Sequence, residues 1–439
     1  MLKNGESMKL LSVYIAGFQS TDRAVYVEFS GDDISVIYGE NGCGKTTFLK
    51  LLHAILSRDD DVLLNESVHY IVLHYEDSNG INHYIPIRQQ SEITDDGIHK
   101  VFYDWSDFVS CDLSDSSSLS LGVERGVTTE SLKVEASDIL RFINIAEYRS
   151  VFSRVDVNEF SERLSFFLKR NQNSKRRNRR DDMNLDIPHV FLQNIKMSNI
   201  ENMLAERYFL ARSMATEKIQ NALFDTLAIA VDASESTEEI VFPSNFENDV
   251  YKNKDRIIEA LDDGYENNFK THIVNILSSI HEERDVNYIL TNELLRKLVM
   301  NMVRELRIEK QLLSSINVLV EVFNSFLVGD KKLVINKQEV YVETEGSKLP
   351  IGTLSSGERH ILTFLALVIV AGRGRNFLII DEPEISLNIK WQRTLLNLLR
   401  ELVPGTQIIV ASHSPVIAKK TPNSLVKLEP MKVEASGYE

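Results

Sequence analysis

A glycine-rich segment near the start of the chain has the residue types and spacing of a phosphate-binding loop. Residues 39–46 read Gly-Glu-Asn-Gly-Cys-Gly-Lys-Thr after an apolar run, as the pattern requires. Glycines let successive backbone N–H groups converge on phosphate oxygens, and the N-terminus of a following helix attracts anions. We expect Lys45 to reach the β- and γ-phosphates of a nucleotide and the Thr46 hydroxyl to bind Mg²⁺. In this loop, here called the P-loop, we assign nucleotide contacts to Gly39, Asn41, Gly42, Gly44, Lys45, Thr46 and Thr47.

A pair of carboxylates follows a second apolar run much later in the chain. Phe377 to Ile380 are consecutive apolar residues, and Asp381 and Glu382 come directly after them. Acidic pairs are common on protein surfaces, but this pair ends a buried strand in a chain that also has a P-loop. Asp381 is therefore predicted to hold Mg²⁺, and Glu382 to orient or deprotonate the water that attacks a phosphate.

Two further motifs resemble the ABC-type ATPases. Residues 354–358 read Leu-Ser-Ser-Gly-Glu, which is similar to that family's Leu-Ser-Gly-Gly-Gln signature and also fits a capping box at a helix start. In the family the signature faces the γ-phosphate of ATP held by a second subunit, so the resemblance implies an ATP-sandwiched dimer. His413 follows an apolar strand and matches the family's switch histidine, which contacts the γ-phosphate. The signature residues that this assigns to ATP are Ser355, Ser356, Gly357 and Glu358.

The spacing of these motifs is similar to one branch of the family. Thr46 and Ser355 lie 309 positions apart, much farther than in transporter subunits, and residues 8–60 and 345–418 look like the core shared by SMC, RecF and OLD proteins. Only 26 residues follow His413, too few for the nuclease domain of OLD proteins. The chain thus resembles the ATPase subunits of Septu or PARIS anti-phage systems, which implies a separate HNH or TOPRIM nuclease. A RecF-like DNA-repair ATPase and a non-hydrolysing scaffold stay open as alternatives.

Composition excludes several other classes of protein. The 439 residues carry a formal charge of −15, with 43% hydrophobic and 26% charged residues, which is typical of a soluble globular chain and argues against general coating of nucleic acid. Two cysteines cannot form a disulfide framework. Because the N-terminus lacks an apolar core and no apolar run is long enough to span a bilayer, we expect a cytoplasmic protein without a membrane segment.

The elements that position these motifs divide the chain into three parts. Residues 1–150 are predicted to form the N-terminal half of an α/β ATPase core, with strands before the P-loop and an antiparallel β lobe after it. Residues 151–330 read as a helical insertion, with one periodic segment from Leu295 to Leu327. Residues 331–439 return to strand–helix–strand order with continuous apolar strands, which predicts a parallel sheet covered by helices on both faces.

Two functional features of the sequence stay unassigned. The glutamine of the family's Q-loop has no clear counterpart, with Gln89, Gln90 and the segment 142–149 as candidates. The segment Lys169–Arg180 places seven cations within twelve residues, which could neutralise phosphates of DNA or form a solvated loop. No aromatic residue lies within it, so sequence-specific base stacking is not expected.

Overall fold

A computed structural model describes residues 8–93, 99–122, 184–193, 195–231, 246–262, 268–286, 291–336, 339–385, 387–414 and 416–433, together with 143, 157 and 164. The chain forms two compact units. One comprises Met1–Ile200 and Leu354–Glu439, and the other comprises Glu201–Thr353. The strands that directly follow residue 331 belong to the second unit.

A six-stranded sheet forms the centre of the first unit, and its neighbouring strands are parallel. Its strand order is β14-β3-β13-β12-β7-β8. Strands β12 and β13 at its centre are fully buried, and each has three or four consecutive apolar residues rather than an alternating pattern. The strands are β3 (Ile34–Tyr38), β7 (Ser118–Leu121), β8 (His189–Leu192), β12 (Phe377–Asp381), β13 (Gln407–Ala411) and β14 (Leu425–Lys427).

The first unit also contains an antiparallel sheet, built mainly from its N-terminal residues. Its order is β15-β2-β1-β4-β5-β6, and in β4 buried residues alternate with partly exposed ones, as expected for a sheet with one covered face. The strands are β1 (Lys9–Ala16), β2 (Arg23–Glu28), β4 (Tyr70–Glu76), β5 (Asn82–Ile93), β6 (His99–Asp104) and β15 (Met431–Lys432). The predicted antiparallel lobe is therefore present.

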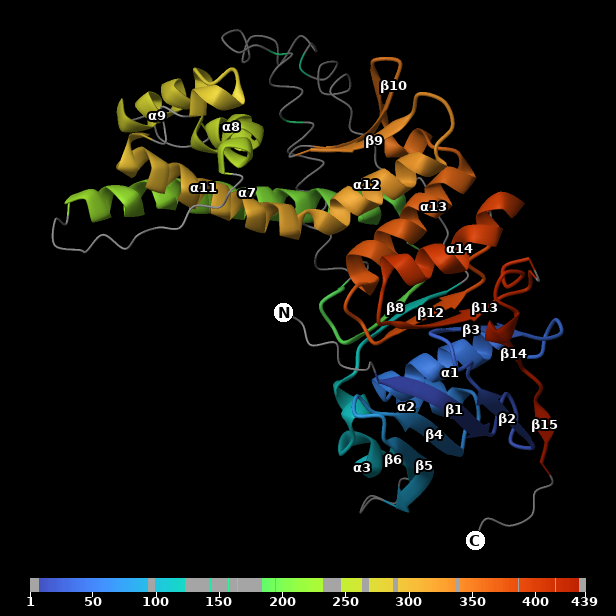
Figure 1. The fold of residues 1–439 in the computed structure, drawn as a ribbon. Helices are drawn as coiled ribbons and strands as arrows, with labels where there is room; N and C mark the ends of the chain where they lie inside the picture. Colours follow the sequence, from blue (N-terminus) through green and yellow to red (C-terminus); the bar gives the residue numbers. More distant parts are fainter. Residues whose placement is uncertain are drawn as a thin grey trace. The chain divides into compact units, whose positions relative to one another are not determined.

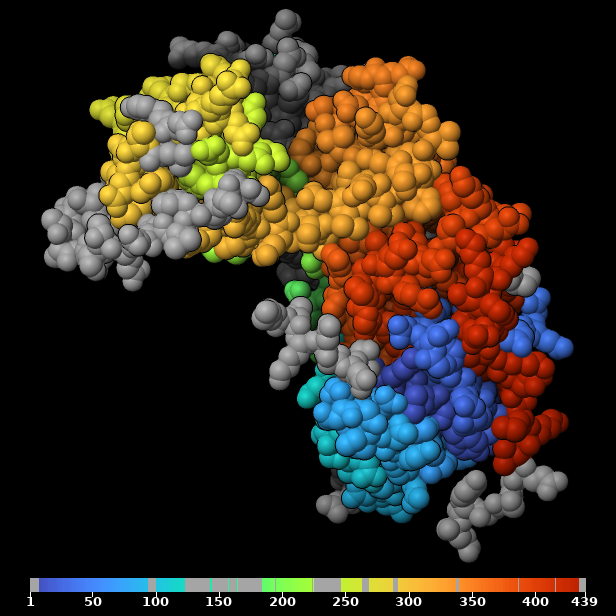
Figure 2. Space-filling model, in the orientation of Figure 1, coloured from blue at the N-terminus to red at the C-terminus, as the bar shows by residue number. Residues whose placement is uncertain are grey.

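Helices cover both faces of the parallel sheet. Helix α1 (Lys45–Ser57) lies on one face, while α13 (Ser356–Leu367) and α14 (Ile389–Leu402) lie on the other (Figure 1). Short helices α2 (Asp60–Asn65) and α3 (Ser106–Val109) accompany the antiparallel lobe. The blue N-terminal and red C-terminal segments pack into one body (Figure 2). This architecture confirms the predicted α/β class, with a parallel sheet flanked by helices, an antiparallel β lobe and a helical segment between the two halves in the sequence.

The second unit is mainly helical and ends in a small antiparallel sheet. The periodic segment Leu295–Leu327 forms two helices that meet at Leu313 rather than one continuous helix. A β-hairpin follows these helices in the sequence, and a third strand extends it. The elements are α7 (Met197–Val231, most of which lies here), α8 (Phe246–Asp262), α9 (Asn268–Ser278), α11 (Glu293–Leu312), α12 (Ser314–Phe326), β9 (Lys332–Ile335), β10 (Val340–Thr344) and β11 (Ser347–Pro350).

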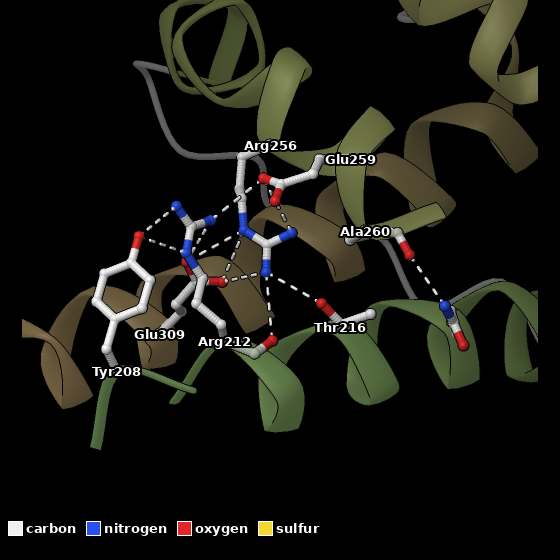
Figure 3. A network of polar contacts seen from close by, with 8 residues as sticks. Tyr208, Arg212, Thr216, Arg256, Glu259, Ala260 and Glu309 are labelled. Carbon is white, nitrogen blue, oxygen red and sulfur yellow. Dashed lines mark hydrogen bonds and ion pairs between the residues drawn. The ribbon is translucent and has the colours of Figure 1, made fainter. Parts of the chain in front are cut away.

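A buried carboxylate joins three helices of this second unit (Figure 3). Glu309 of α11 is 5% exposed. Its Oε1 lies 3.0 Å from Nη1 of Arg212 on α7, and its Oε2 lies 2.9 Å from Nη2 of Arg256 on α8. The Arg256 guanidinium also donates to the Thr216 hydroxyl at 3.1 Å. Because removing one partner of a buried ion pair leaves an uncompensated charge, we expect Glu309 to hold these helices together.

Candidate nucleotide-binding site

Three neighbouring parallel strands bring the predicted chemical groups to one edge of the sheet. Strands β3, β13 and β12 are adjacent, and Ala411 pairs with both Ile37 and Asp381. Parallel strands end at the same edge, so the P-loop after β3, the carboxylates at the end of β12 and the segment after β13 lie together. Backbone hydrogen bonds join them: the N–H of Ser412 donates to the Ile37 carbonyl at 3.1 Å, and that of Glu382 to Ala411 at 2.8 Å.

The P-loop conformation depends on glycine at two positions. Gly42 and Gly44 have φ values of 82° and 96°, in the left-handed region that favours glycine. A Cβ on Gly44 would also lie 2.7 Å from the ring of Phe18. No side chain caps the N-terminus of α1, and the helix has no acidic residue in its first turn. An anion bound at this helix N-terminus would meet backbone N–H groups and a favourable helix dipole.

Lys45 is 4% exposed although it carries a charge. Its ammonium donates to the carbonyls of Gly39 at 3.0 Å and Glu40 at 3.1 Å. These bonds offset the cost of burying the cation and hold it over the loop. The neighbouring hydroxyl of Thr46 is on an exposed residue, so it is accessible to a ligand.

The two predicted acidic residues have different environments. Asp381 is 3% exposed. Glu382 has a φ of 46°, which is uncommon for a residue with a side chain, and its Oε1 lies 3.1 Å from Nε2 of His413. The His413 side chain is 43% exposed. The structure thus brings Glu382 and His413 into contact from two different strand ends, and strained backbone of this kind is often found at functional sites.

The signature segment forms the capping box that its sequence predicts. Ser355 is the N-cap of α13, and its hydroxyl accepts a bond from the Glu358 N–H at 3.3 Å while the Glu358 carboxylate accepts from the Ser355 N–H at 2.8 Å. Ser355 and Ser356 are exposed, and Gly357 is partly buried. These contacts are within the segment itself, so the contact of Ser355, Ser356, Gly357 and Glu358 with a nucleotide stays a prediction.

Comparison of the sequence with protein-family models shows to which family the chain belongs. The model described as "AAA domain, putative AbiEii toxin, Type IV TA system" matches residues 34–419, a range that contains the P-loop, both carboxylates, the signature and His413. The chain belongs to this family. The description names an AAA domain, which agrees with the ATPase activity expected from the motifs of the sequence.

Individual similar proteins were found as well. "Retron Vc95 probable ATPase" from Vibrio cholerae serotype O1 biovar El Tor is 28% identical to this family member over 101 residues, which is 20% of this chain and 20% of the relative's length. An SMC head domain with an extended coiled coil from Pyrococcus furiosus aligns at 12% identity, covering 97% of this chain and 96% of that one, with a TM-score of 0.39. The SMC head domain from Thermotoga maritima aligns at 13% identity, covering 97% and 100%, with a TM-score of 0.37.

Two polar residues at this edge were not identified from the sequence. Gln193 directly follows the parallel strand β8, next to Gly122 at the end of β7, whereas Gln89 and Gln90 lie in β5 of the antiparallel sheet. A glutamine after a short apolar run, in Val-Phe-Leu-Gln, was the available signal. Glu384 lies in the turn after β12 and accepts hydrogen bonds from the segment that carries His413. Its burial could not be read from the sequence, because a glutamate three residues after Asp381 is by type a surface residue.

Several sequence features fall on residues that the structure does not describe. The basic segment Lys169–Arg180 lies outside the described residues, as does the Q-loop alternative at 142–149 except for Ile143. In the part of the chain that the structure describes, no helix is both long and apolar enough to cross a membrane.

Proposed function

We propose that the carboxyl edge of the parallel sheet binds ATP and Mg²⁺ and hydrolyses ATP slowly. The observation that carries this proposal is the convergence of the P-loop, Asp381, Glu382 and His413 at the ends of three adjacent strands. Ligands of open α/β sheets bind at this edge. The P-loop N–H groups and Lys45 would bind the phosphates, since both present donors and positive potential to an anion.

The residues near the P-loop fit a magnesium ion. The Thr46 hydroxyl and the Asp381 carboxylate would offer oxygen atoms, which Mg²⁺ prefers as ligands, and a site with few protein ligands is usual for this ion. Mg²⁺ bound there would supply neutralisation of charge on the β- and γ-phosphate oxygens. The two residues are on neighbouring parts of one sheet edge, so both can serve one nucleotide.

Glu382 and His413 would carry the hydrolysis step. Glu382 has its carboxylate at the sheet edge and in contact with the His413 ring, so it can accept a proton from water or orient it. His413 would donate a hydrogen bond to the γ-phosphate. Gln193 would be the glutamine of the Q-loop, because β8 is two strands from β12 in the same sheet, about 10 Å away at ordinary strand spacing.

The site would be completed by a second copy of the chain. The exposed first turn of α13, with Ser355, Ser356, Gly357 and Glu358, offers a helix N-terminus to an anion. In ABC-type ATPases, which the sequence resembles, the corresponding segment contacts ATP across a dimer interface. We therefore propose an ATP-sandwiched homodimer or a larger homo-oligomer.

A mixing experiment tests this composite site. Lys45→Ala removes the phosphate-binding lysine of one copy, and Ser356→Arg blocks the signature of another, so each variant alone should be inactive. Mixed in equal amounts, the two variants can form hybrids with one intact site of two, so turnover should return, up to about half of the wild-type value. A mixture that stays as inactive as the separate variants, although both bind each other, would contradict a site shared between copies.

We propose further that the ATP state controls a separate effector in defence against phage. The family description names a toxin of a toxin–antitoxin system, and the relative is described as the probable ATPase of a retron. Both descriptions support an ATPase that works with another component. The effector would be a nuclease of the HNH or TOPRIM class, and the protein would work in the cytoplasm.

Phage challenge separates this role from DNA repair. Cells that carry the chain with its effector should lose protection when Lys45 is replaced by alanine, and unchanged protection by that variant would contradict ATP control.

A RecF-like DNA-binding ATPase instead predicts ATP-dependent duplex binding with a steep salt dependence. That dependence should weaken when the cations of Lys169–Arg180 are neutralised. Purified protein that binds no DNA at 50 mM salt would exclude this alternative.

A further inference from the structure

One carboxylate oxygen binds three consecutive residues after β13. Glu384 is 8% exposed. Its Oε1 accepts hydrogen bonds from the Ser412 hydroxyl, from the His413 N–H at 2.9 Å and from the Ser414 N–H at 3.1 Å. Residues 412–414, here called the switch loop, thus have a common acceptor in the turn that follows Asp381.

This arrangement determines where the His413 ring lies. The ring is partly exposed, with its side chain 43% accessible, so few neighbours pack against it. Its backbone, in contrast, is held at Glu384. The ring then meets the Glu382 carboxylate at 3.1 Å. Because Glu382 and Glu384 belong to the same turn, the segment that carries one proposed reacting group also positions the other.

A second contact fixes the far end of the switch loop. The Ser414 hydroxyl donates to Oε1 of Gln392 on α14 at 2.9 Å, and Nε2 of Gln392 donates to the Leu387 carbonyl at 3.0 Å. Gln392 therefore joins the switch loop to the segment that leads from β12 into α14. This bond is neutral and reaches only Ser414, so it supports the loop less than the Glu384 carboxylate does.

We propose that Glu384 is a positioning residue for ATP hydrolysis, which it serves by holding the switch loop so that His413 contacts Glu382. This inference rests on the roles proposed for His413 and Glu382. Charge-assisted bonds from two backbone N–H groups and a hydroxyl give the carboxylate the directional hold that such a role needs. Glu384 itself contacts neither phosphate nor water in the reaction.

Steady-state kinetics with a double-mutant cycle tests the inference. Glu384→Ala should lower kcat about 100-fold, the effect expected from a small misplacement of a reacting group, with KM for ATP unchanged within about 2-fold. Glu384→Gln keeps an acceptor oxygen and should recover part of the rate. Because Glu384 acts through His413, the double variant with His413→Ala should be no slower than His413→Ala alone. Multiplicative losses would overturn the proposal.

Hydrogen exchange of the nucleotide-free protein provides a readout that does not depend on activity. In Glu384→Ala the amides of His413 and Ser414 lose their acceptor, so both should exchange at least 10-fold faster, while β13 keeps its protection. Glu401→Ala, at an exposed position of α14, is the matched control and should change neither. Unchanged exchange at both amides would overturn the positioning role. If exchange rises but His413→Ala leaves turnover intact, the proposed function of His413 fails instead, and the positioning role in catalysis fails with it.

Discussion

Removing the buried carboxylate of the helical unit should cost about 3 kcal/mol of stability. Glu309 is bonded to Arg212 and bidentately to Arg256, whose Nε lies 3.1 Å from each Glu309 oxygen. The side chains of these two arginines are only 21% and 13% exposed, so Glu309→Ala leaves two largely buried cations competing for the remaining acceptors. Breaking a buried pair in this way costs about 3–5 kcal/mol. We take the lower value because Arg256 keeps its bond to Thr216.

Native-state hydrogen exchange at increasing urea measures this loss in α7, α8 and α11 directly. Glu309→Gln, which keeps the shape and one acceptor, should lose about half as much as Glu309→Ala. The matched control is Glu293→Gln on the same helix, because the Glu293 side chain is exposed and surface pairs such as the one it makes with Lys297 contribute less than about 1 kcal/mol. A loss below about 1 kcal/mol for Glu309→Ala, equal to that of the control, would refute the argument that this ion pair fixes the helices.

Three other perturbations follow from single contacts in the first unit. Gly44→Ala should destabilise the P-loop by about 2–4 kcal/mol and reduce nucleotide affinity, because of its positive φ and the Phe18 ring; calorimetry of ATP binding checks this, and Gly31→Ala, with open space around it, is the control that should bind normally. Burial, and secondarily the charge of His189, lowers the pKa of His53 from 6.5 to about 4. The unfolded chain therefore protonates His53 below about pH 6.5 while the folded protein keeps it neutral, so the free energy of unfolding should fall as the pH drops from 6.5 towards 4, by up to about 1.4 kcal/mol per pH unit. Urea unfolding midpoints measured over this pH range should show this dependence, and the same dependence in His53→Asn would contradict it. Arg375→Ala removes donors to the carbonyls of residues 118, 185 and 187, so exchange in β8 should rise while β13 stays protected, and equal protection of β8 would contradict that role.

Local patterns predicted the elements that bear the proposed site. The P-loop, the buried strand before Asp381 and the Ser-x-x-Glu box each have a signal within a few residues, and the structure contains each of them. Contacts between distant segments have no such signal. The pairing of Glu384 with residues 412–414 and the position of Gln193 depend on which strands become neighbours, and sequence spacing did not reveal that order.

The division into units shows the same limit. The periodic apolar residues from 295 to 327 predicted helix correctly, but the break at Leu313 has neither glycine nor proline to mark it. The sequence of the hairpin after residue 331 also does not indicate which unit the hairpin packs on. Its assignment to the helical unit follows from tertiary contacts such as the Asn324 side chain accepting from the Leu333 N–H at 2.7 Å.

The measurement that tests the account most directly is the mass of the Glu382→Gln variant with and without ATP. Glutamine keeps the shape of the side chain but cannot take a proton from water, so the variant should bind ATP and turn it over at least 100-fold more slowly than the wild type. Mass photometry with ATP and Mg²⁺ should then show a dimer or larger assembly, and Lys45→Ala under the same conditions should remain monomeric. Glu382→Gln that hydrolyses ATP at the wild-type rate, or stays monomeric with ATP bound, would contradict the proposed site.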